Sequence, residues 1–199
     1  LDDGNQSYTV VLAAANSSDS GYSGLNPNDV SVTNTDDETV GFTVSSISGN
    51  TTEAGGTATF TVKLSSQPTA NVTIGVSSSD TGEGTVSPSS LTFTSSNWNA
   101  NQTVTVTGVS DSVADGNQSY TVVLAAASSS DSGYSGLNPT DVSVTNTDDE
   151  TAGFTVSSIS DNTTEAGGTA TFTVKLSSQP TANVTIGVSS SDTGEGTVS

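Results

Sequence analysis

The chain contains no cysteine, histidine, methionine or arginine, and lysine occurs only twice. Without cysteine there is no disulfide framework, so any stabilisation beyond the core has to come from packing or from a metal. The absence of histidine and cysteine excludes Ser-His-Asp and Cys-His catalysis as well as histidine-based metal sites. No apolar run is long enough to span a bilayer, and no segment has the pattern of a signal peptide.

Positive charge is also nearly missing, because 21 acidic residues face two lysines and give a formal net charge of −19. A chain without a basic surface cannot neutralise phosphates, which excludes nucleic acids as partners. The same reasoning excludes anionic membrane surfaces, and we expect no membrane insertion. A persistently acidic surface does attract divalent cations.

Most of the sequence is one unit written twice. Residues 1–87 align without a gap to residues 113–199, so that Asp36 recurs 112 residues later as Asp148. Repeats of this length are whole domains in tandem rather than the short turns of a solenoid. The two copies differ only at the positions occupied in the first copy by Leu1, Asp2, Asn16, Asn28, Val40 and Gly49.

An acidic triplet marks the expected boundary between units. It is formed by Asp36, Asp37 and Glu38 and repeated as Asp148, Asp149 and Glu150. Three consecutive carboxylates repel one another, so they indicate either a hard cation at a seam between domains or a solvated acidic linker. We therefore expect a complete repeat at 39–150, the C-terminal part of a preceding repeat at 1–38, and the N-terminal part of a following repeat at 151–199.

The apolar residues alternate with Ser and Thr, which predicts strands and no helices. Gly, Pro, Asn or Asp separate nearly all of these segments. Several short alternating strands within about 110 residues are typical of an antiparallel, immunoglobulin-like sandwich. We therefore predict an all-β chain of tandem seven-stranded β-sandwiches. The expected strands are 40–47, 57–65, 70–77, 91–94, 102–109, 118–126 and 141–145.

Other motifs have an ordinary explanation. Asp80-Thr81-Gly82, repeated at Asp192, has the letters of an aspartic protease dyad but lies in a polar turn rather than on an apolar strand, and we expect no enzyme. Trp98 could be a carbohydrate-stacking platform, but we expect it to cover the end of the core beside Phe93. Lys63 is expected to point outward as a solubilising charge.

The remaining carboxylates favour a metal site. Glu53 follows the first expected strand, while Asp111 and Asp115 lie in the turn between two long strands. Alternate turns of a sandwich fall at the same end, so these side chains and the triplet could converge. Calcium takes six to eight oxygen ligands from carboxylates and loop carbonyls. The alternative is that they are ordinary polar turn residues.

Several of these features together resemble the Calx-beta family. They are Phe42, the Glu53-x-Gly-Gly turn, Phe60-x-Val, Leu91-Thr-Phe, Gln102-Thr-Val-Thr-Val, Asp111-x-x-x-Asp115 and the closing acidic triplet. The resemblance implies a seven-stranded sandwich and calcium ligands at Glu53, Asp111, Asp115, Asp148, Asp149 and Glu150. Asp80 is a further candidate ligand, although the family's Asp-Gly-Thr-Ala stretch is replaced here by Asp80-Thr-Gly-Glu. The repeat carries the same assignment to Asp3, Asp36, Asp37, Glu38 and Glu165.

Family members of this kind occur in tandem in large bacterial surface proteins, so the resemblance implies an extracellular or cell-surface location. The expected function is a calcium-stabilised spacer repeat of an adhesin or fibre, with ions at the seams between domains. The expected partners are neighbouring repeats of the same chain and, in a fibre, identical chains. Two alternatives are the subunit of a self-assembling or bundled filament and a module that binds a polysaccharide or a surface.

Overall fold

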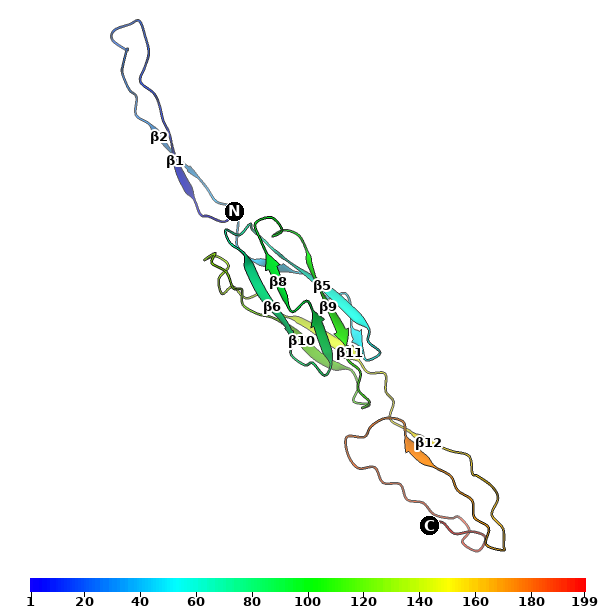
Figure 1. Ribbon diagram of the computed structural model, residues 1–199. Helices are drawn as coiled ribbons and strands as arrows, with labels where there is room; N and C mark the ends of the chain where they lie inside the picture. Colours follow the sequence, from blue (N-terminus) through cyan, green and yellow to red (C-terminus); the bar gives the residue numbers. More distant parts are fainter.

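The computed structural model describes residues 1–199 as strands, turns and loops arranged along one axis (Figure 1). A β-sandwich lies in the middle, formed by residues 39–150, which we call the central unit. A hairpin extends from one end of it, and an open set of extended segments extends from the other. None of the chain forms a helix long and apolar enough to cross a membrane.

Two sheets form the central unit. The five-stranded sheet has the order β4-β11-β10-β6-β8 and the four-stranded sheet the order β3-β5-β9-β7. The strands of the first sheet are β4 (Thr51–Thr52), β6 (Val72–Ser78), β8 (Ser90–Phe93), β10 (Gln118–Leu124) and β11 (Val142–Thr147). Those of the second sheet are β3 (Phe42–Val44), β5 (Thr57–Leu64), β7 (Gly84–Ser87) and β9 (Gln102–Gly108).

The core lies between the sheets and follows the alternation of the sequence. On β5 the residues Phe60, Val62 and Leu64 are buried, whereas Thr61 and Lys63 between them face outward and are more exposed. Similar alternation on β6, β8, β9, β10 and β11, together with Ala127 and Tyr134 from the loop between β10 and β11, completes one cluster of 17 buried residues. Trp98 is half-buried against this cluster, in agreement with the prediction that it covers the core. The all-β sandwich predicted from the sequence is confirmed.

The strand count and one pairing direction differ from the prediction. The central unit has nine strands rather than seven, because β4 and β7 were not predicted. The first is only two residues long, and the second follows a polar turn without clear alternation, so neither produces a periodic signal. β4 also pairs in parallel with β11, with Thr51 opposite Asn146, whereas the other ladders are antiparallel.

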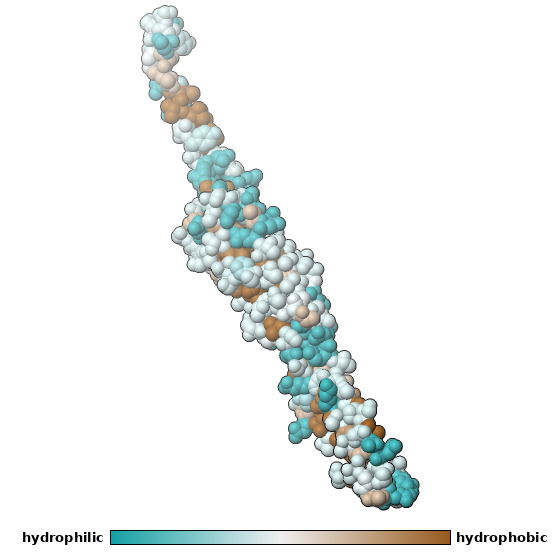
Figure 2. Space-filling view, turned by 45° about the vertical axis from the view of Figure 1, so that its right-hand side comes forward, coloured by the Kyte–Doolittle hydropathy of each residue, from teal (hydrophilic) through white to brown (hydrophobic).

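The two flanking parts repeat pieces of the sandwich. β1 (Gln6–Val10) and β2 (Val30–Asn34) pair in the register of β10 and β11, and β12 (Phe154–Val156) and β13 (Val174–Leu176) in that of β3 and β5. Their side chains are exposed, since Tyr8 is 56% accessible while its equivalent Tyr120 is 5% accessible. Figure 2 shows hydrophobic surface on both flanking parts. The flanking parts thus have sandwich-like pairing without the opposing sheet.

The end of the central unit nearest the hairpin is closed by side chains. The Tyr134 hydroxyl donates to the Ser66 carbonyl at 2.8 Å and accepts from the Ser66 N–H at 3.1 Å. Asp131 accepts from the N–H groups of Thr69 and Gly133 at 2.8 and 2.9 Å. Burial acts to raise the pKa of Asp131, but hydrogen bonds to its carboxylate, led by those from the Thr69 and Gly133 N–H groups, outweigh burial and lower that pKa. The turn around Tyr134 is therefore tied to the loop after β5.

Candidate metal centre

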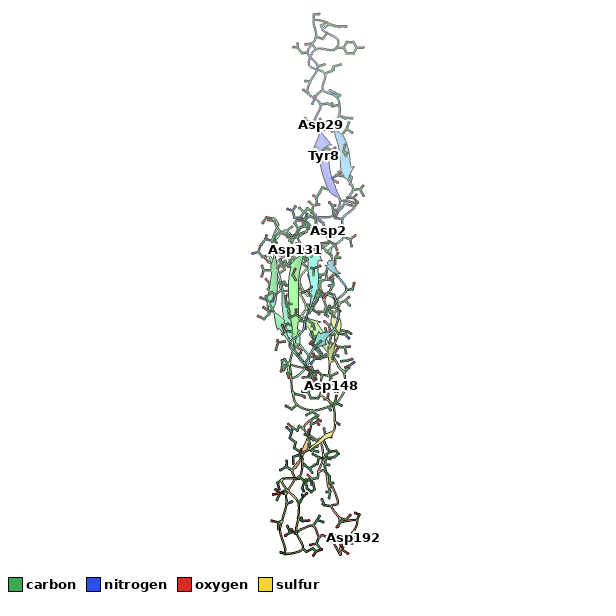
Figure 3. All side chains as sticks on the ribbon, turned by 90° about the vertical axis from the view of Figure 1, so that its right-hand side faces the viewer. Asp2, Tyr8, Asp29, Asp131, Asp148 and Asp192 are labelled. Carbon is green, nitrogen blue, oxygen red and sulfur yellow. The ribbon has the colours of Figure 1, made fainter.

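Five carboxylates meet at the opposite end of the central unit, where the chain leaves the sandwich (Figure 3 labels the neighbouring Asp148). Glu53, Asp111 and Glu150 each offer an oxygen, and these oxygens lie within 4.8 Å of one another. Glu83, Asp111 and Asp115 form a second group by the same measure. Asp111 belongs to both groups. We call these five residues the carboxylate cluster.

Glu53 is placed by the parallel pairing of β4 with β11. The Glu53 N–H donates to the Thr147 carbonyl at 3.0 Å and so extends the ladder beyond Thr52. The turn continues through Gly55, whose φ of 81° favours glycine. At Gly108 a Cβ would collide with the Thr52 carbonyl, so only glycine lets β9 pass this close. The Glu-x-Gly-Gly turn thereby directs a carboxylate inward, and Glu53 is 3% exposed.

Asn146 connects the elements around the cluster. Its side chain is fully buried, with its Oδ1 accepting from the Thr51 hydroxyl at 3.0 Å. Its Nδ2 donates to the Val109 carbonyl at 3.0 Å and to Glu83 Oε2 at 3.3 Å. One amide therefore holds β4, β11, the end of β9 and the turn before β7 in fixed relation, as expected of a buried polar group with all its partners.

Asp148 anchors the turn rather than joining either group. Its carboxylate accepts from the N–H of Glu150 at 2.9 Å and from that of Gly116 at 2.7 Å. These two N–H groups lower the pKa of Asp148, with burial acting in the opposite direction. The bond to Gly116 fixes the triplet against the loop that carries Asp111 and Asp115.

The charges of the cluster are not balanced within the protein. Glu53 Oε2 and Glu150 Oε2 are buried and have no hydrogen-bond donor. The Glu150 carboxyl next to it, burial, and the charges of Asp111 and Asp148 raise the pKa of Glu53 to about 8. Two carboxylates this close need either a shared proton or a cation between them. With no lysine or arginine in the cluster, the donor set is all oxygen and negatively charged.

This donor set fits a hard divalent cation. Calcium is bound by carboxylate and carbonyl oxygens in flexible geometry, and the two orphaned oxygens are unused ligand atoms of that kind. Glu53, Asp111 and Glu150 would hold one ion, and Glu83, Asp111 and Asp115 offer ligands for another. Zinc and copper favour nitrogen or sulfur donors, which are missing here.

The structure places the other candidate ligands outside these groups. Asp149 is exposed, and Asp80 is exposed with its carboxylate accepting from the Gly82 N–H within its own turn at 2.9 Å. In the hairpin, Asp36 accepts from the Gly4 N–H at 2.8 Å, which repeats the bond between Asp148 and Gly116. Neither group of converging carboxylates includes the remaining repeat equivalents, which are Asp3, Asp37, Glu38 and Glu165.

Glu83 is the cluster member that the sequence did not single out. It lies in the turn before β7, and that strand was not predicted. The sequence feature that could have indicated Glu83 is the pair of acidic residues in Asp80-Thr-Gly-Glu83-Gly. Of these two, Glu83 lies next to β7 and reaches the cluster.

The model of the Calx-beta domain family matches residues 33–151. The chain belongs to the Calx-beta family. A structure of domains 1–6 of the surface layer protein SbsC is similar to 86% of this chain and 28% of that one, with 16% identity and a TM-score of 0.33. The chain thus spans under a third of that structure. No curated protein matches the sequence.

Proposed function

We propose that the carboxylate cluster binds calcium and that the chain is a calcium-stabilised spacer of an extracellular or surface protein. The observation that carries this is the pair of buried carboxylate oxygens, Glu53 Oε2 and Glu150 Oε2, which have no donor. A bound cation would supply the missing positive charge without a proton. Family membership agrees, because Calx-beta domains include calcium-binding members.

The position of the cluster supports a mechanical role. Glu150 is the last residue of the triplet that leads out of the sandwich, and Glu53 and Asp111 belong to two turns of the sandwich itself. An ion held between them would tie the outgoing linker to the domain. Figure 2 shows hydrophilic surface where the sandwich meets its flanking parts. Ions at successive seams would turn a string of domains into a stiff rod.

We also propose that residues 1–38 and 151–199 are parts of neighbouring repeats. The same sequence is buried in the central unit and exposed in the flanking parts, as Val122 at 0% and Val10 at 43% illustrate. Leaving such apolar faces in water is unfavourable. In the central unit the second sheet covers them, so in the flanking parts we expect the missing strands of the neighbouring repeat to cover them. No catalysis is proposed, since Asp80 and Asp192 lie in separate exposed turns.

Calorimetry of the full chain tests the calcium site. We expect millimolar calcium to raise the melting temperature by a few degrees relative to EDTA, since a ligand at ten times its Kd stabilises by about 1.4 kcal/mol. Extracellular calcium modules bind with Kd values of about 10⁻⁴ to 10⁻³ M. The Asp111→Asn variant should lose most of this rise, because Asp111 serves both groups.

Asp80→Asn is the matched control, since it makes the same change of charge at an exposed turn outside the cluster. Its melting temperature should respond to calcium like that of the original chain. Equal melting curves in calcium and EDTA, with no heat in a calcium titration, would contradict the proposal. Small-angle scattering in both buffers then measures whether the maximum dimension of the chain depends on calcium.

A further inference from the structure

The two joints of this chain, where the linkers 35–40 and 147–152 leave one unit for the next, have different sequences. Only six aligned positions differ between the copies, and three of them lie at the joints. Val113 and Ala114, in the turn between β9 and β10, take the places of Leu1 and Asp2. Val40 is replaced by Ala152 at the start of the next unit. Positions 2 and 40 therefore both differ between the copies, and these two positions face each other across the first joint.

At the first joint the two varying positions touch. The carboxylate of Asp2 accepts a hydrogen bond from the Val40 N–H, with Oδ2 at 2.8 Å from the nitrogen. Both residues are half-buried. Figure 3 shows Asp2 where the hairpin meets the sandwich, beside the end that carries Asp131. This bond ties the turn at the base of the hairpin to the first residues of the central unit.

Val40 is itself held in the central unit. Its side chain packs against the core, and a Cβ on Gly133 would lie 2.8 Å from Val40 Cγ1. Val40 is therefore bonded to Asp2 through its backbone N–H and packed against the sandwich through its side chain. A bond to this backbone N–H restrains the whole end of the domain rather than a loose linker.

The second joint is held differently. Ala114 has no acceptor in its side chain, and the Ala152 N–H has no hydrogen-bond partner within the protein. This joint has a backbone contact, in which Gln179 N–H donates to the Ser112 carbonyl at 2.7 Å and Val113 forms a parallel bridge with Gln179. The side-chain bond to the first residues of the next unit is therefore present at the first joint and missing at the second.

We propose that position 2, and its equivalent 114, sets the stiffness of the joint by forming or omitting a carboxylate clasp on the N–H of the next unit. The clasp deepens the proposed spacer function and rests on the tandem arrangement proposed above. A hydrogen bond to a charged acceptor in a partly buried place is stronger than one between neutral groups. A chain with aspartate at one joint and alanine at the next alternates a clasped joint with a looser one.

Amide hydrogen exchange read by NMR tests the clasp at a single atom of the full chain. The Val40 N–H should exchange about tenfold more slowly than the Ala152 N–H. Asp2→Ala should remove this protection, whereas Asp2→Asn should retain a large part of it because the amide oxygen still accepts. Asp19→Ala, with the same change of charge in the distant hairpin loop, should leave Val40 unchanged.

The reciprocal variant is Ala114→Asp, which should slow exchange of the Ala152 N–H toward the Val40 rate. The chain has no cysteine, so Ser18→Cys with Ser95→Cys gives a clean spin-label pair across the first joint. Asp2→Ala should broaden their distance distribution.

Repeating the measurements in EDTA separates the clasp from the calcium site. Protection of Val40 should persist in EDTA, even if calcium proves not to bind at all. Val40 exchange that is insensitive to Asp2→Ala, or Ala152 exchange that ignores Ala114→Asp, would overturn the clasp.

Discussion

Glu53 is the residue on which the candidate site depends. It is a buried carboxylate in a chain with two lysines, and its nearest charged neighbour is another carboxylate. Burying an ionised carboxylate without a partner costs more free energy than the other contacts of a single turn residue can offset. The side chain must therefore hold a proton or meet a cation, and this choice makes the stability of the domain sensitive to both.

The pH dependence follows from the sign of that shift. The pKa of Glu53 is raised from 4.5 to about 8 in the calcium-free fold. Below about pH 4.5 both the folded and the unfolded chain hold this proton, whereas between that pH and about 8 only the folded chain retains it. In calcium-stripped buffer the melting temperature should therefore fall as the pH rises from 5 to 8.

Glu53→Gln is the control for this dependence. The variant cannot ionise at this position and can donate to Glu150, so its melting temperature should fall less over the same range. At pH 8 without calcium we expect it to be more stable than the original chain by about 1–2 kcal/mol. A melting temperature that rises from pH 5 to pH 8 in the original chain would contradict the raised pKa.

At the scale of elements, the close crossing of β9 and the turn after β4 positions the cluster. Gly108 lies against the Thr52 carbonyl and the Asn146 side chain, with no room for a Cβ. Gly108→Ala should therefore push the Glu53 turn away and destabilise the domain by about 1–3 kcal/mol. Chemical denaturation measures the loss.

Gly49→Ala is the comparison for this change. A Cβ at Gly49 meets nothing within 4 Å, and its equivalent in the other copy is Asp161. We expect its stability to stay within about 0.5 kcal/mol of the original chain. Equal stability of the two variants would show that the crossing tolerates a side chain.

The elements that the sequence predicted are those with long alternation. β5, β6, β9 and β10 each carry two or more inward apolar residues, so the alternation alone assigns their inward face and approximate bounds. β4 and β7 are short and polar and exist because a neighbouring strand offers backbone partners. Pairing of this kind depends on distant residues, such as Asn146 beside Thr51, and has no local pattern.

At the scale of the whole molecule, identical sequences have different accessibilities. Phe154 is 53% exposed, whereas its equivalent Phe42 packs edge-on against Phe93 and Tyr134 with ring centroids 6.5 and 5.9 Å away. The second sheet, rather than the local sequence, decides which copy is protected.

Limited proteolysis of the full chain measures this difference. A protease of broad specificity should remove much of 1–38 and 151–199 first and leave a resistant fragment close to 39–150, because cleavage requires locally open backbone. Mass spectrometry of the products over time gives the boundaries. Cleavage within the central unit at the same rate as in the flanking parts would contradict the description of the flanks as incomplete sandwiches.

The amino-acid sequence by itself determined the repeat, the β class, the inward and outward faces of the long strands, and the shortage of positive charge to balance the acidic turns. These properties are local or compositional, so they depend on no contact between distant residues. Only the tertiary structure decided which carboxylates meet, because Glu53, Glu83, Asp111 and Glu150 come from turns far apart in the chain. It brought in Glu83, left out Asp80 and Asp149, and buried Glu53, since the crossing of two sheets sets those distances and the spacing along the chain does not.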